Sequence, residues 1–287
     1  MTVFGGRIDD GSPGAIRINP RVMIALLIAA VSVIGYFANS SVNPITGKKQ
    51  HITMSTQDEV AMGLQSAPEM ARQFGGLSQD PEAQRQVDEV GQRLIRALPK
   101  EAPQYPFEFH LLADMKTVNA FALPGGQIFI TEALYRRLQT EAQLAGVLGH
   151  EVGHVLGRHS AERMSKARLA SGLVTATGVG ASGSYSGAQA GQAIASQVAN
   201  FMLMKYGRGD ELESDTLGLR FMVGAGYDPR ALIEVMSILE DASKSAGGGR
   251  TPEWMSTHPN PGNRAERIRQ QIEELFPRGL PPGQLER

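Results

Sequence analysis

The sequence His150-Glu151-Val152-Gly153-His154 is an H-E-x-x-H motif, and the interpretation of the whole chain starts from it. Histidines separated by one helical turn lie on the same face of an α-helix, so both imidazoles can reach a single metal ion. Glu151 projects beside them, where its carboxylate can take a proton from a metal-bound water. The alternative is a core helix with two hydrogen-bonded histidines and a solvated glutamate. We interpret the motif as part of a catalytic zinc site.

The residues around this motif predict a buried helix. Thr140 and Glu141 are favourable at a helix N-terminus, because a threonine side chain can accept a backbone N–H there. Apolar residues then recur at the spacing of one helical face. These apolar positions are Leu144, Val147, Leu148, Val155 and Leu156. The motif is therefore expected on a helix that the core largely encloses.

Two histidines do not complete a catalytic zinc site, which usually has three protein ligands and one open position. A related pattern, H-E-x-x-H-x-x-G-x-x-H, supplies the third ligand as a histidine soon after the motif. Gly157 matches this pattern, but the last position is Ser160, and His159 comes one residue early. One residue is about 100° of helix rotation. We therefore expect His159 to face away from the metal and to end a helix, where a cation is favoured.

The third ligand is expected in the sequence Glu211-Leu212-Glu213-Ser214-Asp215. Glu211 and Asp215 are one helical turn apart and share a face, whereas Glu213 points to the opposite side. Apolar residues flank this run, and an unpaired pair of buried carboxylates would be unfavourable. We predict that Glu211 binds the metal and that Asp215 accepts a hydrogen bond from a histidine ligand. The alternative is an acidic helix start, which the helix dipole favours.

Two short β-prone runs, residues 118–123 and 127–130, come just before the motif helix. Pro124-Gly125-Gly126 separates them and is a strong turn signal. The free edge of such a hairpin can pair with an extended peptide, so we predict a substrate-binding strand. Its candidate residues are Asn119, Ala120, Phe121 and Ala122. An ordinary hairpin with a covered edge is the alternative.

His258 lies in residues 256–261, STHPNP, where two prolines stiffen the loop. Such a loop can present the imidazole to a cleft. There His258 can stabilise the oxyanion of the tetrahedral intermediate, or it can occupy the open metal position at rest. Arg264 can bind the same oxyanion or anchor the loop on a carboxylate. We take both as candidate catalytic residues, and a plain surface loop is the alternative.

Together these motifs, in this order, resemble the M48 family of zinc metallopeptidases over residues 44–276. Residues 43–50, NPITGKKQ, are also similar to the first segment of its periplasmic branch. The resemblance implies a mostly helical α+β fold of the gluzincin type, with a small sheet whose edge strand lines the cleft. It also implies that His150, His154 and Glu211 bind one Zn²⁺ ion, that Glu151 is the general base, and that His258 acts as a switch.

The branch of this family that has multiple membrane spans and acts on prenylated proteins is not favoured, because this sequence lacks those spans. Composition excludes further classes of function. The chain has 287 residues, a formal net charge of −1 and no cysteine. Its balanced charge gives no basic surface for nucleic acid. The lack of cysteine excludes disulfides, thiolate catalysis and cysteine-ligated metal.

Residues 22–38 form an apolar run without charge near the N-terminus. This length is at the short end of what crosses a bilayer as a helix. Arg7, Arg17 and Arg21 precede the run, so the positive-inside rule predicts a cytoplasmic N-terminus and an exported domain. A cleaved signal peptide is the alternative. We favour an uncleaved anchor, because no clean cleavage signal follows the run.

The chain divides at changes in composition. We predict a cytoplasmic tail at 1–21, a transmembrane anchor at 22–38, a linker at 39–55, a peptidase domain at 56–277 and a C-terminal tail at 278–287. Residues 170–199 are rich in Gly, Ala and Ser and carry no charge. Such a run predicts either a mobile loop that covers the cleft or a helix packed closely through small residues. The sequence leaves both open.

These observations lead to one preferred function. We predict a membrane-anchored zinc metalloendopeptidase whose catalytic domain lies outside the cytoplasm, on the periplasmic side of an inner membrane. Its expected partners are polypeptide substrates and the membrane, and not nucleic acid. The family resemblance implies quality control of misfolded or unassembled envelope proteins. Two alternatives remain open: a chaperone or assembly factor that binds in the same cleft without cutting, and a structural zinc protein.

Overall fold

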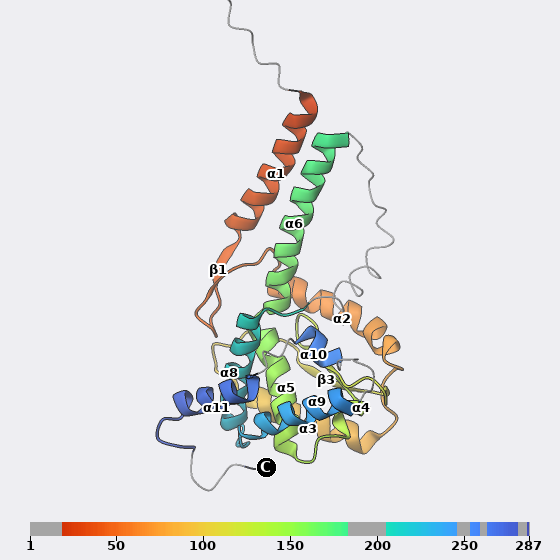
Figure 1. The fold of residues 1–287 in the computed structure, drawn as a ribbon, viewed down its shortest axis with the longest axis vertical. Coiled ribbons are helices and arrows are strands. Elements are labelled where there is room, and N and C mark those ends of the chain that lie inside the picture. The colour runs from red at the N-terminus through yellow and green to blue at the C-terminus, as the bar shows by residue number, and fades with distance from the viewer. Residues whose placement is uncertain (1–18, 183–204, 246–252, 259–262, 281–285, 287) are drawn as a thin grey trace, which may run out of the picture.

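The computed structural model describes residues 19–182, 205–245, 253–258, 263–280 and 286. This part of the chain is mostly helical and has two small sheets, as expected for an α+β protein. Figure 1 shows a core of packed helices from which two long helices, α1 and α6, project side by side. The elements are α1 (Pro20–Ala38), β1 (Ser40–Val42), β2 (Lys49–His51), α2 (Thr56–Gln73), α3 (Pro81–Arg96), β3 (Glu108–Leu112), β4 (Ala120–Ala122), β5 (Gln127–Thr131), α4 (Glu132–Tyr135), α5 (Glu141–Leu156), α6 (His159–Ser182), α8 (Arg208–Gly224), α9 (Ala231–Ser245), α10 (Glu253–Thr257) and α11 (Arg264–Leu275).

Helix α5 carries the H-E-x-x-H motif through the core. Thr140 is its N-cap, and the Thr140 side chain accepts a hydrogen bond from the backbone N–H of Gln143 at 3.2 Å. Every residue from Ala142 to Leu156 is buried. The helix packs against α3, α8 and α9. The prediction of a buried motif helix is therefore confirmed.

Small residues let α8 lie close to α5. A Cβ atom on Gly153 would lie 2.7 Å from the Ser214 side-chain oxygen and 2.8 Å from the Ser214 carbonyl oxygen. The Ser214 hydroxyl in turn donates a hydrogen bond to the carbonyl oxygen of His150. A Cβ on Gly149 would be 3.4 Å from the carbonyl oxygen of Gly218. This close packing brings the carboxylates of α8 within reach of the histidines of α5.

The three-stranded sheet has the order β3-β5-β4, with β3 parallel and β4 antiparallel to β5. The turn between β4 and β5 contains Gly125 at φ 81° and Gly126 at φ 105°, a conformation that glycine adopts without strain. Both predicted β-prone runs are thus strands of one hairpin. Within the described residues β4 has a neighbour on one side only, so it is an edge strand.

Residues 39–55, predicted to be a linker, contain β1 and β2, which pair in an antiparallel manner. Side chains from this hairpin dock on the C-terminal end of α5. The Asn43 side-chain amide donates to the carbonyl oxygen of Leu156 at 2.8 Å, and that of Gln50 donates to the carbonyl oxygen of Gly157 at 2.6 Å. The hairpin therefore ties the base of α1 to the helix that carries the motif.

Helix α1 contains the apolar run at 22–38. Among the described residues it is the one helix that is long and apolar enough to cross a membrane, and none of it is buried. Residues 170–182 belong to α6, so for them the helix interpretation is correct and the loop interpretation is wrong. Residues 183–199 lie outside the described residues, as do Arg7, Arg17 and the two prolines that follow His258.

Candidate metal centre

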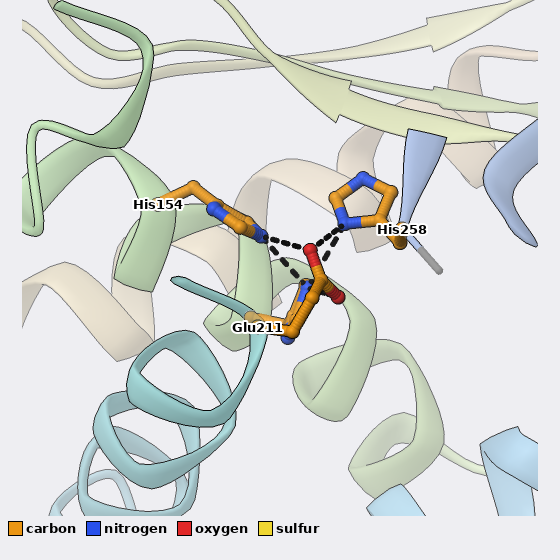
Figure 2. Close-up of side chains that lie close together, drawn as sticks. His154, Glu211 and His258 are labelled. Carbon is orange, nitrogen blue, oxygen red and sulfur yellow. Dashed lines mark hydrogen bonds and ion pairs between the residues drawn. The ribbon is translucent and has the colours of Figure 1, made fainter. Parts of the chain in front are cut away.

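Four buried side chains converge at the centre of the molecule: His150, His154, Glu211 and His258. One donor atom from each lies within 4.8 Å of all the others. Figure 2 shows His154, Glu211 and His258 pointing toward one another from three separate elements. Glu211 Oε1 is 3.3 Å from His154 Nε2 and 3.0 Å from His258 Nδ1. The structure thus brings the three predicted ligands together and adds His258 to them.

The chemistry of these donors fits a zinc ion. The Nε2 atoms of His150 and His154 face each other at 3.0 Å, and His258 Nδ1 is 3.2 Å from His150 Nε2. Nitrogen lone pairs and a carboxylate that point at one place repel one another unless a cation lies between them. Three imidazoles and one carboxylate are a donor set that zinc accepts. The buried residues therefore suit a zinc ion rather than an apolar core.

Electrostatics favour the protonation states that metal ligands need. Burial opposes ionisation of Glu211, but His258 and His154 hold the pKa of this carboxyl well below its usual value. Burial also holds the pKa of His154 well below its usual value, which keeps that imidazole neutral. For His258, burial opposes the charged form, but Glu211 and Glu151 raise its pKa. The two histidines therefore differ: negative charge from Glu211 and Glu151 raises the pKa of His258, whereas burial lowers that of His154.

Asp215 and Arg264 contact two of the candidate ligands, His150 and Glu211. Asp215 Oδ1 is 2.9 Å from His150 Nδ1, as the spacing on α8 predicted. The Arg264 guanidinium donates to both Asp215 oxygens, at 3.0 and 2.7 Å, and its Nη1 is 3.0 Å from Glu211 Oε2. Burial raises the pKa of Asp215, but the charge of Arg264 and the bond to His150 lower it overall. This geometry matches the carboxylate-anchor alternative for Arg264.

His159 lies elsewhere than expected. Arg158 has φ 54°, so the chain turns sharply after α5 ends at Leu156, and His159 begins α6 instead of ending a helix. The rotation argument assumed one continuous helix, so it did not apply. His159 Nδ1 lies 2.9 Å from His154 Nδ1, and its Nε2 lies 2.9 Å from a carboxylate oxygen of Glu213. His159 therefore orients His154 in the way that Asp215 orients His150.

The contact with His159 also accounts for the position of the Glu213 side chain. Its side chain does point away from Glu211 and Asp215, as the helical-face argument requires, but there it meets His159 and the ammonium group of Lys48 at 2.9 Å. The sequence contained a signal for this chain of contacts, because each histidine ligand needs a partner for its second ring nitrogen. Only Asp215 had been assigned such a role.

Glu151 is fully buried, and its carboxylate faces the cluster. One oxygen accepts a hydrogen bond from Trp254 Nε1 at 3.4 Å and lies 3.6 Å from His258 Nε2, and the other has no partner in the described structure. Trp254 stacks on His258 with ring centroids 4.7 Å apart. Tyr206 stacks on His154 at 3.8 Å. Sequence reasoning missed both aromatic residues, because nothing local links them to the motif.

A pocket beside the cluster is bordered by β4. Asn119, Phe121 and Ala122 line it together with His258 and Tyr206. The fourth candidate substrate residue, Ala120, is fully buried and does not line the pocket. Three of the four predicted strand residues therefore lie next to the metal cluster.

Comparison with known proteins agrees with these motifs. A model of peptidase family M48 matches residues 81–272. The chain is 31% identical over 241 residues to the beta-barrel assembly-enhancing protease of Yersinia pestis, an alignment that covers 82% of this chain and 48% of that protein. The corresponding protease of Escherichia coli K12 is 30% identical over 266 residues, with 89% and 53% covered. The mitochondrial metalloendopeptidase OMA1 of Bos taurus is 36% identical over 173 residues, with 59% and 32% covered.

The chain spans about half the length of the beta-barrel assembly-enhancing proteases that it matches. The matched family region includes α5, α8 and the residues up to Arg264, and thus the whole metal cluster. The chain belongs to peptidase family M48.

Proposed function

We propose that this chain is a zinc-dependent metalloendopeptidase that hydrolyses misfolded or unassembled envelope proteins. In this proposal α1 anchors it in the membrane and the catalytic domain lies outside the cytoplasm. The observation that carries the proposal is the buried convergence of His150, His154 and Glu211 with Glu151 beside them. The names of the assembly-enhancing proteases support an envelope substrate, and OMA1 supports a membrane-associated endopeptidase.

His150, His154 and Glu211 would hold the zinc ion. When bound, zinc supplies the Lewis acidity that polarises a peptide carbonyl and makes water acidic enough to attack it. Asp215 accepts a hydrogen bond from the Nδ1–H group of His150, and His159 contacts Nδ1 of His154. Each contact leaves an Nε2 lone pair directed at the cluster. Glu151 takes the proton from the attacking water and passes it to the leaving amine, because its buried carboxylate has a free oxygen there.

The free edge of β4 would hold the substrate as an added antiparallel or parallel strand. Asn119, Phe121 and Ala122 border the pocket next to His258, so a peptide paired with this edge would pass the cluster. The side-chain oxygen of Asn119 is buried and has no hydrogen-bond partner in the described structure. An N–H group of the substrate would satisfy it. Backbone pairing of this kind recognises an extended, unfolded segment rather than a particular sequence.

Chelation tests whether the chain is a zinc peptidase. We expect the purified full-length protein to cleave unfolded casein, to lose this activity with 1,10-phenanthroline and to regain it when zinc is added. The isomer 1,7-phenanthroline, which does not chelate, is the matched control. Cleavage is measured by gel electrophoresis and mass spectrometry of the products. Binding of casein without any zinc-dependent cleavage would replace this proposal with the chaperone alternative.

A second candidate, a structural zinc site, is favoured by one observation: His258 supplies a fourth donor, and four protein ligands close a zinc site. We instead propose that His258 is a displaceable plug. It directly follows α10, a five-residue helix that is attached to the core through Trp254. A plug keeps water out of the open position until substrate displaces it.

The His258→Ala variant distinguishes these roles. We expect basal casein cleavage to rise by roughly tenfold or more, the gain expected if no more than about one molecule in ten is open at rest. The His110→Ala variant, which removes a histidine outside the cluster, should leave the rate unchanged. A loss of roughly 10²–10³-fold with zinc retained would identify His258 as an oxyanion donor. Loss of zinc and of folding would identify a structural site.

A further inference from the structure

Helices α1 and α6 lie side by side and run in opposite directions (Figure 1). Their contact is close at Gly172 of α6, where an added Cβ would lie 2.2 Å from the Ser32 side-chain oxygen and 2.8 Å from Ser32 Cβ. Nearer the domain, Tyr36 of α1 is close enough to Lys166 of α6 to influence its pKa. Because both helices rise by about 1.5 Å per residue, these two contacts set which residues lie at the same height.

The charged residues of α6 all lie at its domain end. Arg168 is the last of them, and residues 169–182 carry no charge. Counting from the contact between Gly172 and Ser32, residues 169–182 lie beside residues 22–35 of α1, which are also free of charge. The uncharged part of α6 is about 21 Å long at about 1.5 Å per residue. If α1 crosses a bilayer, this part of α6 therefore lies at the depth of the hydrocarbon.

The side chains of this part of α6 suit that depth. Toward α1 it presents Gly172 and the buried Ala176, and small residues of this kind let helices pack closely in a membrane. On the outside, Leu173 and Val174 are exposed, and the exposed fraction of Val174 is 70%. An exposed valine beside an exposed apolar helix is unfavourable in water and favourable in lipid.

Three hydroxyl groups at this level are paired within their own helices. Thr175 Oγ1 donates to the carbonyl oxygen of Ser171 at 2.9 Å, and Thr177 Oγ1 donates to that of Val174 at 2.8 Å. Ser32 Oγ on α1 likewise donates to the carbonyl oxygen of Ile28 at 2.8 Å. A hydroxyl in hydrocarbon has no water to bind and needs such a partner. These bonds remove most of the penalty of inserting threonine and serine into lipid.

We propose that residues 169–182 of α6 enter the lipid bilayer beside α1, so that two helices and not one embed this peptidase in the membrane. The occupant of their exposed apolar faces is the acyl-chain region of the bilayer. This inference rests on α1 being the anchor in the proposed function, but it concerns a segment between the zinc ligands. Helix α6 enters the bilayer in contact with α1. Helix α1 covers the face of α6 that carries small residues.

The proposal has a consequence for the metal centre. Helix α6 begins at His159, which contacts the ligand His154 and also Glu213. Residues 159–168 separate this contact from the uncharged part of α6 by about 15 Å at about 1.5 Å per residue. The inserted helix would therefore hold the metal centre at a fixed, short distance from the membrane surface.

The absence of natural cysteine makes a direct test simple, because single-cysteine variants need no other change. Three variants of the full chain place a cysteine at positions of similar exposure: Val174→Cys on α6 at 70%, Val31→Cys on α1 at 62% and Met115→Cys on the domain at 56%. Each is reconstituted in vesicles of phosphatidylcholine and phosphatidylglycerol, and reaction with a membrane-impermeant maleimide is measured. In duplicate samples a fluorophore is attached to the cysteine. Quenching of its fluorescence by lipids brominated at the middle of the acyl chain is then measured.

We expect Val174→Cys and Val31→Cys to react at least about tenfold more slowly than Met115→Cys, and only these two to be quenched, because the thiolate forms in water and not in hydrocarbon. Rapid reaction at Val174 with protection at Val31 would overturn this proposal and leave the α1 anchor in place. Rapid reaction at both positions would overturn the anchor and this proposal together. Casein cleavage by each variant shows that it is folded.

A cross-link tests the pairing of the two helices separately from depth. In the Ser32→Cys/Gly172→Cys variant the two Cβ atoms would start 2.8 Å apart, so the helices need to separate by about 1 Å to reach the roughly 3.8 Å of a disulfide. We expect this variant to form an intramolecular disulfide in vesicles on mild oxidation. The Ser32→Cys/Met115→Cys variant should not. Cross-linking of the second pair to the same extent as the first would contradict the side-by-side arrangement and with it the proposal.

Discussion

The Glu151→Gln variant is expected to lose nearly all casein cleavage, by roughly 10²–10⁴-fold, while it keeps its zinc. Glu151 is fully buried beside the cluster, but it is not among the residues whose donor atoms converge there. Glutamine has the same shape and can still accept from Trp254, so the fold should be unchanged. The amide cannot take a proton from water, however, and the hydrolytic step stops.

The matched control is Glu141→Gln, the same substitution on the same helix at an exposed position in its first turn. This variant should cleave casein at the wild-type rate. Zinc content is measured by elemental analysis of all three proteins after removal of free metal. Cleavage by Glu151→Gln at the wild-type rate would show that another group is the base.

The Glu211→Ala variant is expected to lose zinc and, as a result, activity. Its carboxylate is the only acidic donor among the four converging groups in the described structure, and without it three imidazoles remain to hold the cation. Asp215→Ala should have an intermediate effect of roughly 10–100-fold on zinc affinity, since Asp215 acts through His150. Loss of Asp215 also leaves the buried Arg264 with one carboxylate fewer.

Glu213→Ala is the control from the same helix. It removes a carboxylate that reaches the centre only through His159, so zinc affinity should fall by about tenfold or less, at the lower limit for a residue that supports a ligand. All affinities are measured by competition with a fluorescent zinc chelator at fixed pH. A greater loss of zinc in Glu213→Ala than in Glu211→Ala would contradict the assignment of the third ligand.

Local patterns were enough to predict the helices of the centre and which face of each carries a donor. The positions of His150 and His154 on α5, and of Glu211 and Asp215 on α8, follow from helical periodicity alone. The strong turn at Gly125 and Gly126 also indicated the hairpin of β4 and β5. These predictions succeeded because each depends on residues close together in sequence, where backbone geometry leaves few alternatives.

The contacts that the sequence did not predict depend on how the chain turns between elements. His159 was expected to face away, but the positive φ of Arg158 ends the helix and returns His159 to His154. The contacts of Asn43 and Gln50, within the predicted linker at 39–55, with the end of α5 were not predicted at all. No periodicity indicates such contacts, because a single backbone angle or a distant carbonyl oxygen decides them.

The sequence by itself indicated the chemistry that we propose: the candidate metal ligands, the candidate base and the apolar run of α1. Only the tertiary structure decided which distant residues contact these groups. His258 and Trp254 reach Glu151 from more than a hundred positions away, and α6 meets α1 through Gly172 and Ser32. A donor type follows from the side chain and its local spacing, whereas a contact between distant elements follows from the packing of the whole core, which no local pattern encodes.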